Sequence, residues 1–241
     1  MGARRRYRHL IAAAAVAALP ATAAIAAPSN VDISRAIYAQ VKPPDVGRPS
    51  HVKFSLDVTK DANRGGRTLR SAAFRFARGF RVDRSAVGAR CSNGQARSFS
   101  CPPQSLIGSG SIVASVAGGT QRVVGQLKLY LGTAQHAATG AVAADVRAAG
   151  HRRAATGRIV RIDDPVYAYE LRIDGLNSAT GGGQVEQIHA TIGATRTSGG
   201  RTESLVTNPK ICPGGWHYGV VVTYKDGTQH RGDGAASCRY P

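Results

Sequence analysis

The sequence is short of acidic residues, with 14 Asp and Glu against 32 Lys and Arg and a formal net charge of +18. Glycosidases use two carboxylates that face each other across a sugar. The local cluster of acids here is Asp163, Asp164 and Glu170, which lie around Pro165. We expect a solvated turn at this position. The alternative function is a secreted hydrolase whose site is built from these acids or a histidine, brought together from distant parts of the chain.

The sequence also lacks the common motifs of nucleophilic catalysis and metal binding. No G-x-S-x-G element is present to place a serine at a sharp turn. The histidines form neither an H-x-H nor an H-E-x-x-H arrangement. We therefore predict no catalytic residues, no metal site and no cofactor, and the sequence favours a protein that is not an enzyme.

Long apolar runs are confined to the N-terminus. Four arginines precede an alanine-rich run from Leu10 to Ala27, which Pro20 interrupts. This pattern is typical of a secretion signal peptide, with cleavage after Ala26 or Ala27. A transmembrane anchor is the alternative, but the run is weakly apolar and contains a proline. We expect a protein that is secreted or at the cell surface, with no transmembrane anchor after cleavage.

The positive charge has two interpretations. Removing the four arginines of the signal peptide leaves +14, which would attract polyanions. Alternatively, the charge reflects an arginine-rich composition, because the arginines are scattered singly along the chain. Nucleic-acid binding proteins gather such residues in a patch or stripe, so we expect no nucleic acid. An anionic cell-wall polymer or a surface protein is the partner that we predict.

The few cysteines predict two disulfides. The chain contains four: Cys91, Cys101, Cys212 and Cys238. An even number in an exported protein favours a disulfide framework, although the sequence allows three connectivities. We favour Cys91 with Cys101 and Cys212 with Cys238, because each pair closes a short loop. A four-cysteine zinc site is the alternative, but zinc ligands are usually more closely paired in the sequence.

Alternating polar and apolar residues predict an all-β protein. In the segment 51–58, residues Val52, Phe54, Leu56 and Val58 would share one buried face. We expect about ten strands, near residues 51–58, 73–76, 109–116, 127–131, 141–147, 157–162, 167–173, 188–192, 216–224 and 228–237. Such a series predicts an antiparallel β-sandwich, Ig-like or jelly-roll-like. The predicted organisation is a signal peptide (1–27), an extended lead-in (28–49) and one domain (50–241).

The Asp226-Gly227 pair predicts the closing hairpin of the domain. This dipeptide between two strands is typical of a type I′ turn, so the last two strands should be antiparallel. Cys212 precedes the first of these strands and Cys238 ends the second. The hairpin would therefore bring the two cysteines together.

Aromatic residues and histidines of the closing hairpin are the candidate ligand surface. Trp216, Tyr218 and Tyr224 could form an aromatic platform for carbohydrate, with His217 and His230 beside them. The alternative is that the aromatic side chains pack into the core, as they usually do on strands.

A local segment resembles a family of exported proteins of high-GC Gram-positive bacteria. The segment from Cys91 to Ser111 reads C-P-P-Q-S-L-I-G-S-G from its second cysteine, Cys101, which is similar to the family's C-P-x-S-x-I-G-x-G pattern. The stretch from Asn208 to Cys238 resembles the family's Cys-bounded hairpin. Where the family usually has L-P-x-G, Arg78 replaces the proline. The family is uncharacterised, so the resemblance implies export but no activity.

Overall fold

The computed structural model describes residues 31–116, 120–133, 140–148, 151–176 and 183–241. The expected signal peptide and its cleavage site lie outside these residues. Within the described part of the chain, no helix has the length and hydropathy to cross a membrane.

Twelve strands of the described chain form one hydrogen-bonded sheet. They are β1 (Val31–Asp32), β2 (Ile37–Lys42), β3 (His51–Asp57), β4 (Leu69–Ala77), β6 (Leu106–Val116), β7 (Gln121–Gly132), β8 (Gly140–Ala148), β9 (His151–Arg161), β10 (Tyr167–Asp174), β11 (Gln184–Ile192), β15 (Trp216–Tyr224) and β16 (Gln229–Ala236). Two short pairs lie outside the sheet: β5 (Arg81–Val82) with β14 (Val206–Thr207), and β12 (Thr195–Ser198) with β13 (Arg201–Ser204).

The helical segments that the structure describes in full are short. They are η1 (Ser34–Ala36), η2 (Val58–Lys60), α1 (Asn93–Arg97), η3 (Arg84–Ala86) and η4 (Pro103–Ser105). The α1 segment is one turn long, and the four others are 3-10 turns. The prediction of an all-β protein is therefore confirmed.

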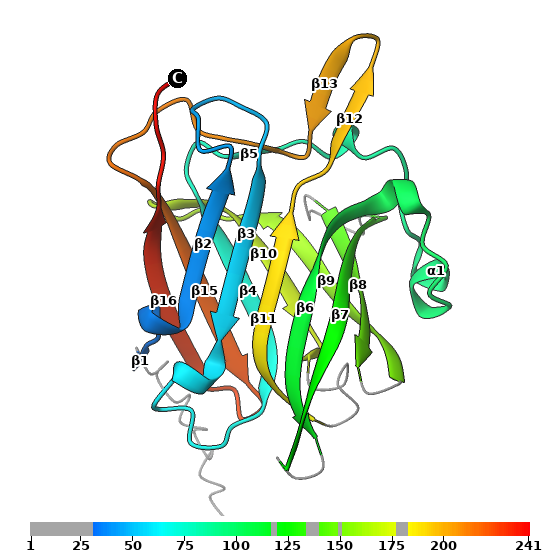
Figure 1. Cartoon of the computed structure of the whole chain (residues 1–241), viewed down its shortest axis with the longest axis vertical. Coiled ribbons are helices and arrows are strands. Elements are labelled where there is room, and N and C mark those ends of the chain that lie inside the picture. Colours follow the sequence, from blue (N-terminus) through cyan, green and yellow to red (C-terminus); the bar gives the residue numbers. More distant parts are fainter. Residues whose placement is uncertain (1–30, 117–119, 134–139, 149–150, 177–182) are drawn as a thin grey trace, which may run out of the picture.

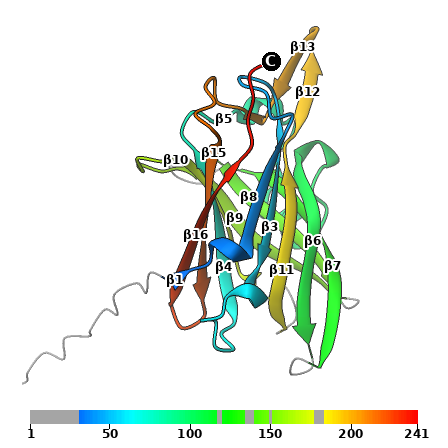
Figure 2. The same cartoon turned by 60° about the vertical axis from the view of Figure 1, so that its left-hand side comes forward.

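The sheet curls until its two ends approach each other. Its strand order is β1-β16-β15-β4-β10-β9-β8-β7-β6-β11-β3-β2. Figure 1 shows β2, β3, β11, β6 and β7 in front of the remaining strands, and Figure 2 shows the molecule turned towards the side where β2 and β16 lie. The core lies between the two layers. Strands β2 and β16 lie along a common groove of about 260 Å³ but are not hydrogen-bonded neighbours.

This arrangement differs from the expected ten-strand antiparallel sandwich. The two layers are parts of one sheet, because β7 and β8 are paired from Gln126↔Arg147 to Gly132↔Ala141. The sheet is also mixed, since β1 pairs in parallel with β16. A sheet of this width has a strong cumulative twist and curls, which lets one face bury itself.

The alternating pattern correctly located the strands with a buried face. All ten expected segments overlap strands of the sheet. In β3, Val52, Phe54 and Leu56 are buried, whereas Lys53 is exposed. The pattern did not show that the strands form a single sheet, because side-chain alternation does not show which strands are neighbours.

The interpretation of residues 28–49 as a lead-in outside the domain was wrong for its central part. Strand β2 pairs with β3, and Ile37, Ala39 and Val41 are buried in the core. Prolines 43, 44 and 49 follow this strand, so they limit its length without preventing it. The domain therefore includes β1 and β2.

The closing hairpin forms where it was predicted, but its turn is of another type. Strands β15 and β16 are antiparallel, with Thr223 opposite Gln229. The loop has three residues, since the Gly227 amide donates to the Tyr224 carbonyl and the Tyr224 amide donates to the Thr228 carbonyl. Only Gly227 has a positive φ, of 86°, whereas a type I′ turn needs two such residues.

Both predicted disulfides are present. The Cα atoms are 5.0 Å apart in Cys91–Cys101 and 5.7 Å apart in Cys212–Cys238. The described residues contain no free cysteine. Zinc binds cysteine as a thiolate, so the alternative of a four-cysteine zinc site was wrong.

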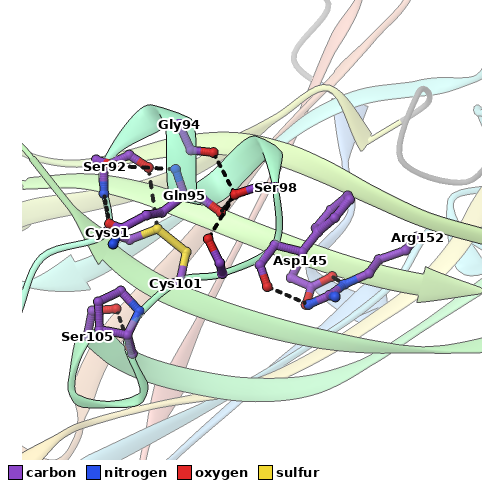
Figure 3. Close-up of a disulfide and its surroundings, with 12 residues drawn as sticks. Cys91, Ser92, Gly94, Gln95, Ser98, Cys101, Ser105, Asp145 and Arg152 are labelled. Carbon is purple, nitrogen blue, oxygen red and sulfur yellow. Dashed lines mark hydrogen bonds and ion pairs between the residues drawn. A yellow bond between two sulfur atoms is a disulfide. The ribbon is translucent and has the colours of Figure 1, made fainter.

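The Cys91–Cys101 loop is fixed at both ends (Figure 3). At its start, Ser92 and Gln95 form a capping box at the N-terminus of α1. At its end, the Arg152 guanidinium donates to both Asp145 carboxylate oxygens, at 2.9 and 2.6 Å, and to the Phe99 carbonyl at 3.2 Å. The guanidinium also lies 4.4 Å from the centre of the Phe99 ring. These contacts hold the loop against β8 and β9.

Candidate functional site

A cleft of about 890 Å³ opens at one end of the curled sheet. It lies where β4 and β9 end and β10 begins, because Tyr167 is opposite Ala77 and Tyr169 is opposite Arg161. The residues that line it are Arg78, Gly79, Phe80, Arg81, Arg161, Ile162, Asp163, Tyr167, Ala168 and Tyr169. We refer to it as the arginine cleft.

Three arginines surround the arginine cleft. Arg78 is engaged, since its Nε donates to the Asp164 carbonyl at 2.7 Å and its guanidinium lies 3.8 Å from the Asp163 carboxylate. Arg81 and Arg161 are exposed, and their side chains have no hydrogen-bond or ion-pair partner among the described residues. The cleft therefore has two guanidinium groups available to an anion.

The floor of the arginine cleft is apolar and rigid. Phe80 is buried, and its ring centre lies 5.5 Å from that of Trp216 and 6.1 Å from that of Phe76. Gly79 makes this turn possible because its φ is +93°, and a Cβ there would lie 2.9 Å from a Pro209 carbon. The backbone that carries Arg78 and Arg81 is therefore held in place by the core.

The wall formed by residues 163–167 is held by hydrogen bonds. The Asp164 carboxylate accepts from the amides of Val166 at 2.8 Å and Tyr167 at 3.0 Å, and these bonds lower the pKa of Asp164. The Tyr167 hydroxyl donates to the Asp233 carboxylate. Burial, followed by this hydrogen bond, raises the pKa of Tyr167, so the phenol stays neutral.

The acids proposed for a hydrolase do not form a pair across the cleft. Asp163 lines the cleft and is fully exposed. The Asp164 carboxylate already accepts hydrogen bonds from the Val166 and Tyr167 amides. Glu170 is buried outside the cleft lining, where Arg75 and Arg172 each lie 3.1 Å from its carboxylate. A general acid needs a raised pKa, whereas that of Asp164 is lowered.

The candidate ligand surface on the closing hairpin is largely inside the protein. Trp216, Tyr224 and His230 are 2%, 0% and 1% exposed, so they cannot form an aromatic platform. They pack in the core, as the alternative interpretation predicted. Tyr218 is partly buried, and only His217 is exposed.

The two histidines of the hairpin do not meet. His217 is opposite Ala235, whereas His230 is opposite Val222, near the other end of the strand pair. Their side chains also lie on opposite faces of the sheet, because residues at odd and even positions alternate.

A buried polar cluster was missed by sequence analysis. The Asp61 Oδ2 atom accepts from the Tyr224 hydroxyl at 2.5 Å and lies 2.5 Å from Nδ1 of His230. Asp61 also accepts from the Asn63 amide at 3.0 Å. This cluster ties the loop after β3 to the closing hairpin. No local pattern indicates it, since Asp61 is far from its partners in the sequence.

A serine–histidine contact lies on the outer face of the sheet. The Ser55 hydroxyl is 2.5 Å from Nδ1 of His189, its cross-strand neighbour. Neither residue lines a described cavity, and no group of three potential metal ligands occurs among the described residues. Serine catalysis needs a cleft with oxyanion donors, and this pair lies outside the cavities described above, so we do not take it as a candidate active site.

The arginine cleft is thus the feature of the described chain that is best suited to binding a ligand. Comparison with known proteins adds no assignment, since no family model, no curated protein and no solved structure matches the chain.

Proposed function

We propose that the protein is a secreted or cell-envelope binding protein, not an enzyme, and that it holds an anionic group in the arginine cleft. The observation that carries this proposal is the pair of exposed guanidinium groups, Arg81 and Arg161, which line one cleft and form no ion pair or hydrogen bond with the described residues. The carboxylate that lines the same cleft, that of Asp163, lies beside Arg78. Positive groups at one cleft repel each other, so an anion between them is favoured.

The proposed location is supported by three observations. The first residues have the pattern of a signal peptide. The two disulfides are compatible with an oxidising compartment outside the cytosol. The segment from Cys91 to Ser111 resembles that of exported proteins of high-GC Gram-positive bacteria. Together they favour a protein that acts at the cell surface or beyond it.

The proposed ligand is an anionic component of the cell envelope, such as a wall polymer with phosphodiester groups. An arginine guanidinium can donate two parallel hydrogen bonds to phosphate, which a lysine cannot. The apolar floor at Phe80 and Ile162 would contact the uncharged part of the ligand. An acidic surface protein would use the same arginines through carboxylates.

Titration calorimetry with poly(glycerol phosphate) tests the proposal. We expect binding that weakens steeply as salt is added, because exposed charges are screened. Replacing Arg81 and Arg161 with glutamine should weaken binding about tenfold or more per arginine, since a hydrogen bond to a charged group contributes about 1.5–3 kcal/mol.

The matched control is Arg70→Gln. Arg70 is exposed at the opposite end of β4 and carries the same charge. Equal losses in the cleft variant and the control would show that the binding depends on overall charge alone. Binding that is independent of salt would contradict the proposal.

A further inference from the structure

Exposed apolar side chains lie around the arginine cleft. Val166, Ile211 and Tyr240 are 41%, 65% and 61% exposed. None of the three lines the cleft. We define the end surface as these three residues together with Arg78, Arg81, Arg161 and Lys210.

A chain of contacts connects the members of the end surface. The Arg78 amide donates to the Val166 carbonyl at 2.8 Å, and Phe80, two residues on, packs against Trp216. The Trp216 indole donates to the Ile211 carbonyl at 2.8 Å. These contacts, together with Pro209 against Gly79, place Val166 and Ile211 at the same end of the sheet, on either side of the turn at Gly79.

The C-terminus extends the same surface. The Cys212 amide donates to the Tyr240 hydroxyl at 3.2 Å, and Cys212 is bonded to Cys238. Figure 1 shows the C-terminus, β5 and the segment before β15 at the same end of the sheet. The exposed apolar groups are thus held by the disulfide and the core.

The end surface is positively charged. Lys210 is exposed, as are the three arginines, while the acids here are Asp163 and Asp164, both beside Arg78, and Asp83, whose charge interacts with that of Arg81. Arg239 is close by but is paired with Asp45 at 2.7 Å. Basic residues mixed with exposed apolar residues are typical of proteins that lie on anionic membrane surfaces.

We propose that the end surface docks on a membrane that contains anionic lipid, with a lipid phosphate in the arginine cleft. This inference rests on the proposed function, because it assigns the anion of that site to a lipid headgroup. Val166, Ile211 and Tyr240 enter the interface between the headgroups and the acyl chains. A hydrophilic wall polymer would use the arginines alone and would gain nothing from these apolar side chains.

Sedimentation with vesicles tests the inference. The full protein after signal cleavage is mixed with vesicles of phosphatidylglycerol and phosphatidylcholine, or of phosphatidylcholine alone. We expect it to sediment with the anionic vesicles only. Replacing Arg81 and Arg161 with glutamine should reduce partitioning about thirtyfold, since each basic residue near such a surface contributes about fivefold.

The apolar residues distinguish a membrane from a soluble anion. The variant Val166→Ser with Ile211→Ser should bind vesicles severalfold more weakly but bind soluble poly(glycerol phosphate) as the unchanged protein does. The control is Val124→Ser, since Val124 is 73% exposed and lies towards the other end of the sheet. It should leave vesicle binding unchanged.

Each outcome decides between the two proposals. Binding of poly(glycerol phosphate) without binding of anionic vesicles would overturn the membrane inference and leave the proposed function in place. Equal vesicle binding by the Val166/Ile211 variant and the unchanged protein would also overturn it. Failure of both ligands to bind would overturn the inference and the proposed function together.

Discussion

Replacing Asp61 with alanine should destabilise the protein strongly. The carboxylate is buried and contacts two groups that are themselves buried, the Tyr224 hydroxyl and Nδ1 of His230. The substitution would leave both without their partner. An unsatisfied buried polar group costs about 1–3 kcal/mol, so we expect a loss of about 3–5 kcal/mol. This is a large part of the roughly 5–15 kcal/mol that stabilises a typical domain.

Urea unfolding followed by tryptophan fluorescence measures this loss. Trp216 is the one tryptophan of the chain and is buried, so its emission reports the opening of the core. With a urea dependence of about 2–3 kcal/mol per molar, the midpoint should fall by about 1–2.5 M. The control is Asp163→Ala, which removes a fully exposed carboxylate. A difference between the two variants below about 0.5 kcal/mol would refute the reasoning.

The variant Tyr224→Phe tests whether the three groups act together. It keeps the ring but removes the hydroxyl, so we expect a loss of about 1–2 kcal/mol. Combining it with Asp61→Ala should cost less than the sum of the two single losses, because both remove the same hydrogen bond. Additive losses would show that the hydroxyl and the carboxylate do not interact.

Three further predictions concern the wall of the cleft and the loops. The pKa of Asp164 is lowered in the folded state, so its stabilisation is present above the unfolded pKa and is lost as pH falls through the folded pKa. Asp164→Asn should therefore reduce the difference in urea midpoint between neutral pH and about pH 3. Gly79→Ala should cost more than about 1 kcal/mol, measured by urea unfolding, because of its positive φ and its proximity to Pro209. Replacing Cys91 and Cys101 together with serine should cost about 2–3 kcal/mol by the same assay, because the closed loop is short.

The sequence carried most of the information about which residues form strands. The alternation of Val52, Phe54 and Leu56 is visible without a structure, and it corresponds to one buried face of β3. Strand β2 has the same alternation, but the prolines that follow it obscured the pattern. In β15, Trp216 and Tyr224 have the same parity as Val220 and Val222, which predicts their common burial. That signal was available and favoured the core over a ligand platform.

The arginine cleft could not be predicted in the same way. Arg81 and Arg161 come together because the end of β4 is paired with the start of β10, and this pairing depends on the order of strands in the sheet. Side-chain alternation fixes the face of a strand but not its neighbours. The scattered arginines of the sequence therefore gave no indication of where they would meet.

The curl of the sheet also protects its edges. A flat sheet of this kind would present a row of free backbone donors and acceptors along each outer strand, and such rows recruit strands from other molecules. Here β2 and β16 face each other across their common groove, and β1 covers the start of β16. Each edge thus shields the other from a neighbouring copy. We therefore expect the curl to disfavour the joining of sheets from two copies through their edges.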